Sequence, residues 1–202
     1  MEHLKVDFNK VIESLKLSEK SINSRKENFN QFVENGFPNK RAEDWKFSDL
    51  NQIISSNIEN LRFHTDFEIS EIDETTFIDK FAHNKIIFLN GVISKVDFSS
   101  EDDTKVLITR DLNQNENSKE VNSLVSLNNA LIANYTRVTV KENYSMNKPL
   151  IIYNITTKEL KSTAINLKTD IVLEKNSSLK LIDLFDDNSE NNFINIVQNF
   201  DI

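Results

Sequence analysis

The chain has 202 residues, of which 38% are hydrophobic and 28% charged, a composition that is ordinary for a soluble globular protein with a sizeable core. It contains no Cys, which excludes a disulfide framework, a thiolate zinc site, a cysteine nucleophile and Cys-ligated iron–sulfur binding within this chain. The two Gly, Gly36 and Gly91, lie too far apart to form a Gly-rich phosphate loop. The net charge of -8 argues against a nucleic-acid-binding surface.

Targeting and catalytic signals are weak. The first ten residues mix charge with isolated apolar residues, and no stretch has the length and apolarity of a signal peptide or a membrane helix. We therefore expect a cytoplasmic protein with no membrane partner. His3, His64 and His83 share no motif, and no Ser lies in a nucleophile elbow. We predict no catalytic residue, no metal ligand and no cofactor bound by this chain alone.

Residues 1–83 are predicted to be a helical and irregular region. Apolar residues recur at helical spacing from Phe8 to Val33, and a polar stretch over residues 18–28 leaves open whether they form one long helix or two. Gly36 and Pro38 predict the end of this helical part. In the compact segment that follows, Asn39 and Ser48 are predicted caps. A short helix is expected near residues 75–81.

Residues 84–134 are predicted to be a linker region that contains a hairpin and one helix. Asn90 and Gly91 separate two apolar runs, and this pair supplies the positive φ angles that a type I′ turn requires. The acidic run Glu101–Asp103 is expected to be a solvated turn, since Asp favours local backbone hydrogen bonds. A helix is predicted over residues 123–134 from the spacing of its Leu and Ala residues.

Residues 135–202 read as short strands separated by turn clusters, with separate strands expected at 164–167 and 170–173. Strands at such spacing are typical of a sandwich, a barrel or a β-solenoid. The last strand, residues 194–202, is still alternating where the chain stops, so its edge is expected to be open. We expect either a partner chain over this edge or, in preference, a longer protein of which this is the N-terminal portion.

Trp45 is the only Trp of the chain. Because Trp buries a large area, we expect it to anchor the helical region onto the β part, with Arg41, Glu43 and Lys46 as a charged rim. A binding role for this aromatic residue is the alternative.

The segment around Trp45 resembles a signature near the N-terminus of SufD, a scaffold subunit of the SUF iron–sulfur assembly machinery. It reads GFPNKRAEDWKFSDL, and the matching residues are Gly36, Pro38, Arg41, Glu43, Trp45, Lys46, Phe47, Ser48 and Leu50. Further matches follow in the family's order: Asn90 and Gly91 in a hairpin, Leu127 and Asn128 in a helix, and Pro149 before a strand. The sequence departs at Asn39, near Asn134 and near residues 166–168, where the family more often has Thr or Ser, Gly and Arg.

The resemblance implies an α+β protein, in which an N-terminal helical region is followed by a right-handed parallel β-helix that is truncated and open at residue 202. It implies a non-enzymatic scaffold that works with a SufB-like scaffold and a SufC-like ATPase, whose binding regions lie beyond Ile202. No cluster-assembling residue has a counterpart here, so the signature residues are expected to be structural. Physical reasoning from the sequence does not distinguish the SufD branch from the related SufB branch. The alternative is an unrelated β-solenoid that serves as a protein-interaction module.

Overall fold

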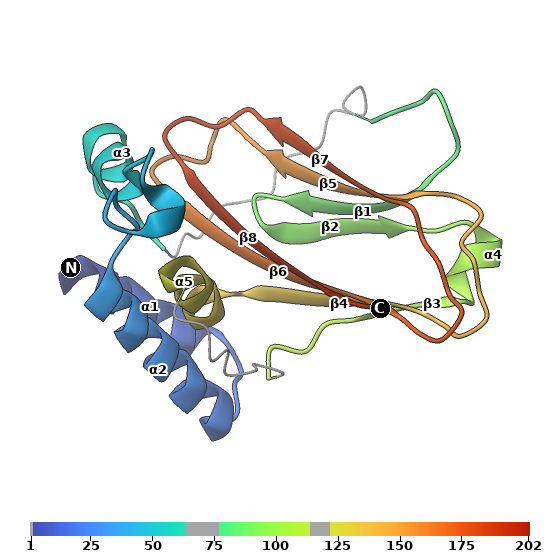
Figure 1. Ribbon diagram of the computed structural model, residues 1–202, viewed down its shortest axis with the longest axis horizontal. Helices are drawn as coiled ribbons and strands as arrows, with labels where there is room; N and C mark the ends of the chain where they lie inside the picture. The colour runs from blue at the N-terminus through green and yellow to red at the C-terminus, as the bar shows by residue number, and fades with distance from the viewer. Residues whose placement is uncertain (1, 64–76, 114–121) are drawn as a thin grey trace.

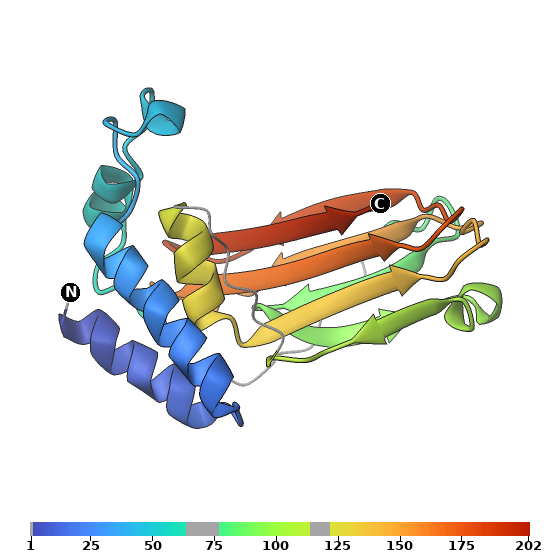
Figure 2. The ribbon, with the colours of Figure 1, turned by 60° about the horizontal axis from the view of Figure 1, so that its bottom comes forward.

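The computed structural model describes residues 2–63, 77–113 and 122–202. Two β-sheets face each other, and most of the helices gather at one end of this pair, with one short helix at the other end (Figures 1 and 2). Of the described helices, none is both long and apolar enough to cross a membrane.

The helical end begins with α1 (Glu2–Ser14) and α2 (Glu19–Asn35), so the apolar pattern from Phe8 to Val33 belongs to two helices and not to one long helix. Ser18 separates them, and its side chain accepts a hydrogen bond from the backbone N–H of Ser21, which caps α2. Gly36 ends α2 as predicted: its φ of 67° is in the left-handed region, and its N–H donates to the carbonyl oxygen of Phe32. The remaining helices are η1 (Glu43–Trp45, a 3-10 helix), α3 (Leu50–Asn57), α4 (Ser100–Asp103) and α5 (Ser123–Leu131).

Each sheet has four strands, in the orders β2-β1-β5-β7 and β3-β4-β6-β8. The strands of the first sheet are β1 (Asn84–Leu89), β2 (Val92–Asp97), β5 (Leu150–Thr156) and β7 (Leu181–Asp187). Those of the second are β3 (Val106–Thr109), β4 (Asn134–Val140), β6 (Ala164–Leu173) and β8 (Phe193–Asp201).

Both sheets are mixed. The pairs β1–β2 and β3–β4 are antiparallel, while β1–β5, β5–β7, β4–β6 and β6–β8 are parallel. The α+β class is therefore as expected, but the right-handed parallel β-helix, or solenoid, predicted for residues 135–202 is wrong. Its place is taken by a sandwich-like pair of mixed sheets. The expectation failed because residues 84–134 are not only a linker. They contribute β1 and β2 to the first sheet and β3 to the second, where they pair with the strands of residues 135–202.

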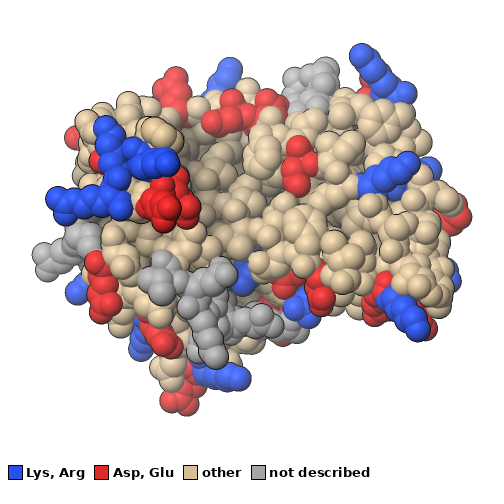
Figure 3. All heavy atoms as spheres, in the orientation of Figure 1, with Lys and Arg blue, Asp and Glu red and all other residues tan. Residues whose placement is uncertain are grey.

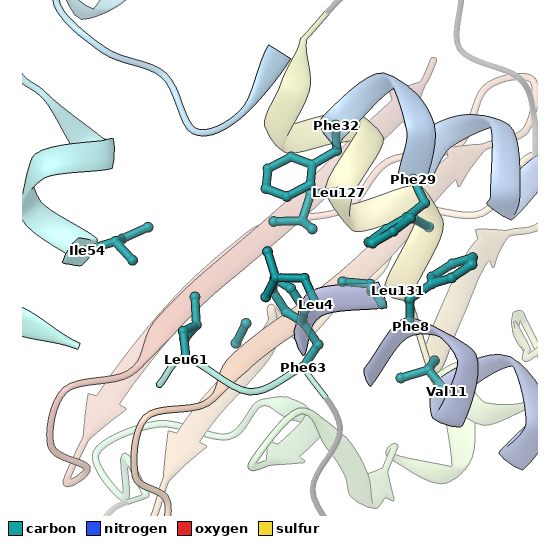
Figure 4. Packing of buried hydrophobic residues seen from close by; sticks show 12 residues of the cluster. Leu4, Phe8, Val11, Phe29, Phe32, Ile54, Leu61, Phe63, Leu127 and Leu131 are labelled. Atoms are coloured by element: carbon teal, nitrogen blue, oxygen red, sulfur yellow. The ribbon is translucent and has the colours of Figure 1, made fainter. Parts of the chain in front are cut away.

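Three apolar clusters hold these layers together. One lies between the sheets and includes Phe88, Val138, Ile152 and Ile171, none more than 2% exposed. A second covers the outer face of the first sheet around Tyr153. The third joins the helices to the sandwich; Figure 4 shows it, with Leu4, Phe8, Val11, Phe29, Phe32, Ile54, Leu61, Phe63, Leu127 and Leu131 labelled.

Two local predictions differ from the structure. Residues 164–173 form the single strand β6, because Lys168 and Thr169 are buried within the sheet rather than placed in a turn. The helix expected near residues 75–81 falls partly outside the described residues, and residues 77–81 are irregular. The predicted hairpin is confirmed, with Asn90 at a φ of 50° and Gly91 at 83°.

Candidate functional site

The signature segment folds into a compact loop between α2 and α3. Its turns are closed by Asn39, whose side-chain oxygen accepts from the N–H of Arg41 at 2.9 Å, and by Pro38, whose carbonyl accepts from the N–H of Asn51 at 3.1 Å. The cap of α3 is Asp49 and not Ser48 as predicted, because the Asp49 carboxylate accepts from the N–H of Gln52.

Phe37 fixes this loop to the rest of the protein. Its ring makes edge-to-face contacts with Phe32 of α2, at a centroid distance of 5.0 Å, and with Phe193 of β8, at 5.5 Å. Leu50, at the start of α3, packs against the same helical core. The anchor predicted at Trp45 is therefore supplied by Phe37, eight positions earlier in the chain.

Trp45 instead lines a pocket of about 620 Å³, which we call the Trp45 pocket. Its wall is formed by residues of the signature loop together with the first residues of α5. The lining residues are Asn35, Phe37, Pro38, Asn39, Arg41, Ala42, Asp44, Trp45, Asn122 and Ser123. Asn122 is held in place because its side-chain oxygen accepts from the N–H of Leu124 at 3.0 Å and caps α5.

The chemistry of the Trp45 pocket suits a piece of polypeptide. Phe37 and Trp45 offer aromatic surface, Arg41 and Asp44 offer one charge of each sign, and Asn35, Asn39 and Asn122 offer amide donors and acceptors. Next to the pocket, Phe47 is 88% exposed and lies under the Lys46 ammonium, 5.0 Å from the ring centroid. Aromatic side chains and Arg, the types present here as Trp45, Phe47 and Arg41, are enriched in contacts between proteins.

The other signature residues divide into two groups. Arg41, Glu43, Lys46 and Phe47 are exposed, so packing does not explain why these residue types stand at these positions. Gly36, Pro38 and Leu50 shape the loop and its contact with the core.

The downstream signature residues are structural and lie in the β part and α5. Asn90 exchanges two side-chain hydrogen bonds with Thr157, both of 2.9 Å, and Gly91 lies against Ile165. Leu127 is fully buried, and the Asn128 amide donates to the carbonyl oxygens of β6 and β8. The Pro149 carbonyl accepts from the N–H of Asn84 at 2.9 Å.

Asp102 contradicts the expectation of a solvated acidic turn. It lies in α4, is fully buried, and accepts hydrogen bonds from Asn84 at 2.9 Å, Ser99 at 2.7 Å and Tyr144 at 2.8 Å. Burial by itself would raise the pKa of Asp102, but these hydrogen bonds outweigh it and the pKa is lowered. Burial and the bond to Asp102 raise the pKa of Tyr144 to about 12. This cluster ties the first sheet to the turn before β5.

A second polar cluster lies on the outer face of the second sheet. The Asp170 carboxylate accepts from the Tyr135 hydroxyl at 2.5 Å, from Arg137 at 3.2 Å and from Asn199 at 2.8 Å. Burial would raise the pKa of Asp170, but the three donors lower it overall. The residues occupy neighbouring register positions on β4, β6 and β8, so we interpret the cluster as a cross-strand tie.

Of the three histidines, His83 is the one whose side chain the structure describes. His64 lies outside the described residues. His83 is half-buried, not solvated as expected, and its Nε2 atom lies 2.9 Å from the Tyr153 hydroxyl. Among the described residues, no group of three or more His, Asp or Glu side chains is placed to hold a metal ion.

Comparison with protein-family models finds no match to the chain, and comparison with the curated proteins finds no significant match.

Proposed function

We propose that this chain is a scaffold subunit of iron–sulfur cluster assembly, similar to SufD, that acts in the cytoplasm by holding other proteins and not by catalysis. The observation that supports the proposal is the signature loop itself. Its members Arg41, Glu43, Lys46 and Phe47 are exposed and are not needed for packing. Arg41 lines the Trp45 pocket, and the other three are next in sequence to the lining residues Asp44 and Trp45 or follow them within two positions.

A surface role explains this arrangement better than a structural one. A packing signature would place its aromatic and charged residues against neighbours, as Phe37 is placed against Phe32 and Phe193. Phe47 is left in solvent with only the Lys46 ammonium over its ring, so its apolar surface is available to a partner. Since the β-helix implied by the resemblance is not found, the proposal rests on this loop and its pocket.

The partners that we propose are a SufB-like scaffold and a SufC-like ATPase, with the signature loop as a contact in addition to the binding regions that the resemblance places beyond Ile202. To test them, the tagged natural gene product is co-expressed with each partner from the same organism, and the mass of the purified complex is measured. We expect a stable complex that Phe47→Ser and Trp45→Ala weaken at least tenfold. Val6→Ser is the matched control, because Val6 is also an exposed apolar residue but lies on α1.

A genetic experiment tests the pathway independently of any interface. Deletion of the gene should lower the activity of iron–sulfur enzymes in the cell, and the wild-type gene should restore it. Unchanged activity in the deletion strain, together with no complex with either partner, would refute the proposal.

A further inference from the structure

Two amide groups of the Trp45 pocket are held with their donor ends free. The side-chain oxygen of Asn39 accepts from the N–H of Arg41, and the side-chain oxygen of Asn122 accepts from the N–H of Leu124. These bonds fix which end of each amide is the oxygen, so the NH2 group is the end left for a ligand. Within the described residues, neither NH2 group donates to another atom of the protein.

Donors also outnumber acceptors among the other lining side chains. The indole N–H of the half-buried Trp45 has no acceptor among the described residues, and the Arg41 guanidinium is exposed. The acceptors are the Asp44 carboxylate and the oxygen of Asn35, whose NH2 group already donates to a carbonyl of α2. The Ser123 hydroxyl can serve as either. The pocket therefore suits a ligand that is rich in acceptors.

The apolar part of the wall is rigid before any ligand binds. The Phe37 ring is fixed edge-to-face against Phe32 at 5.0 Å and against Phe193 at 5.5 Å. Next to it, Pro38 has a backbone φ angle that its own ring restricts. Together with Trp45, these residues form a preformed ring surface, so binding orders little of the pocket and costs little conformational entropy.

The pocket carries no net charge. Its charged lining residues, Arg41 and Asp44, have opposite signs. Figure 3 shows basic and acidic side chains next to each other over the loop between α2 and α3, at the left of the view. The charged residues next to a lining residue in sequence are also balanced in sign, and they are Glu34, Lys40, Glu43 and Lys46. The electrostatic complement of this wall is therefore a row of carbonyl oxygens without a formal charge.

A proline-rich extended segment matches this complement better than a helix or a β-strand does. A helix uses most of its carbonyls in its own hydrogen bonds, and a strand presents N–H groups as well as carbonyls. A polyproline II segment has no internal hydrogen bonds, and proline has no N–H, so the segment offers carbonyl oxygens alone. Its proline rings pack on aromatic surfaces such as those of Phe37 and Trp45.

We propose that the Trp45 pocket binds a short proline-rich segment of a partner protein in the polyproline II conformation. The indole N–H of Trp45 and the NH2 groups of Asn39 and Asn122 donate to carbonyl oxygens of the segment. Its proline rings pack against Phe37 and Trp45. The pocket volume of about 620 Å³ suits a few residues of such a segment. This occupant rests on the proposed function, in which the pocket is a contact between proteins.

The test uses the intrinsic fluorescence of Trp45, which is the only Trp of the chain and reports directly on the pocket. The probe is an oligoproline of about nine residues, which spans about 28 Å as polyproline II. We expect a saturable shift of the Trp45 emission to shorter wavelength as the ring is covered. Fluorescence anisotropy of the labelled probe gives the affinity, and a matched peptide in which Ala and Ser replace Pro should bind at least tenfold more weakly.

Two substitutions exchange a donor of the pocket for an acceptor. Asn39→Asp and Asn122→Asp each keep the oxygen that accepts from the backbone, and Asp caps a helix as well as Asn does, but the NH2 group is lost. We expect each to weaken oligoproline binding at least fivefold and to leave the circular dichroism unchanged. Asn9→Asp is the control, because Asn9 is exposed on α1 and does not line the pocket, and its affinity should stay within twofold of wild type.

Equal binding of the two peptides, or affinities within twofold of wild type for both pocket variants, would overturn the proline-rich segment as the occupant. The proposed function would still stand if the complex with a SufB-like or SufC-like partner formed and depended on Trp45. Conversely, specific oligoproline binding would support this occupant even if deletion of the gene left iron–sulfur enzymes unchanged, a result that counts against the proposed function alone.

Discussion

The Nη1 group of Arg25 donates a hydrogen bond to the carbonyl oxygen of Ile132, 2.7 Å away, although 107 positions separate the two residues. The same nitrogen donates to the carbonyl of Ala130 at 3.1 Å. Arg25 is fully buried in α2, and burial lowers its pKa to about 10, which still leaves it charged at neutral pH. Its cation therefore satisfies the last carbonyls of α5, where the helix dipole is negative.

We expect Arg25→Ala to lower the free energy of unfolding by about 3–5 kcal/mol, because two buried carbonyls lose their donor and a cavity is left. Urea unfolding followed by circular dichroism measures the change. Arg62→Ala is the control, since the Arg62 side chain is exposed, and it should cost less than about 1 kcal/mol. Equal effects of the two substitutions would refute the role of Arg25 as a tie between helices.

The pH dependence of stability should reveal Asp102. Because its pKa is lowered in the folded protein, its contribution is present above the ordinary Asp value of about 3.9 and is lost as the pH falls through the folded pKa. We expect Asp102→Asn to be less stable than wild type at neutral pH, since an amide cannot accept from all three donors. Urea unfolding at a series of pH values should show this difference narrowing below about pH 4.

The pH dependence of stability that arises from Asp183 should have the opposite sign to that from Asp102. Burial raises its pKa, against the bond from Gln198, so the stability that its protonated form contributes is lost as the pH rises from about 3.9 through the folded pKa. Asp183→Asn keeps the acceptor for Gln198 and removes the half-buried charge. We expect it to raise the urea midpoint at neutral pH and to match wild type in acid. A lower midpoint at neutral pH would contradict this assignment.

The two glycines provide a matched pair. Both have positive φ, but a Cβ at Gly91 would lie 2.6 Å from Ile165 Cγ2, whereas a Cβ at Gly36 would meet nothing within 4 Å. We expect Gly36→Ala to cost about 1 kcal/mol through backbone strain alone and Gly91→Ala to cost about 2–4 kcal/mol, measured by thermal or urea unfolding. Equal costs would show that Ile165 moves away freely.

Substitutions at Phe37 and Trp45 should differ in their effect on the free energy of unfolding. Phe37→Ala removes contacts with Phe32 and Phe193 and should lower the free energy of unfolding by about 2–4 kcal/mol. Trp45→Ala should cost less than about 1.5 kcal/mol, because the side chain is half-buried and lies outside the helical core cluster. The reverse order, measured by urea unfolding, would restore Trp45 as the packing anchor.

Local signals predicted those parts of the fold that depend on local chemistry. The hairpin follows from the positive φ angles that Asn90 and Gly91 accept, and the end of α2 follows from Gly36 in the same way. The continuous strand β6 was not predicted: separate strands were expected at 164–167 and 170–173, on either side of Lys168 and Thr169. In the structure, the Lys168 ammonium donates to the side-chain oxygen of Asn129, 39 positions away. This hydrogen bond allows the charged Lys168 side chain to be buried within the sheet.

Contacts between distant residues account for the remaining errors. Asp102 was expected in a solvated turn because Asp favours local hydrogen bonds. Its actual partners Asn84 and Tyr144 lie 18 and 42 positions away, so no local pattern could reveal them. The signature loop could be recognised as one segment, but the Trp45 pocket also needs Asn122 and Ser123 from α5. The pairing of β1 with β5 could not be inferred either, because parallel partners carry no turn signal between them.

The hairpin turn also bears on chemical ageing. An Asn followed by Gly deamidates when the glycine nitrogen attacks the asparagine side-chain carbonyl, a step that needs a mobile side chain. Asn90 is 4% exposed, and Thr157 holds both atoms of its amide. The folded protein thus protects the Asn90–Gly91 bond, whereas Asn35, which precedes Gly36, is exposed. Deamidation at Asn90, followed by peptide mass spectrometry, should therefore record the time that the chain has spent unfolded.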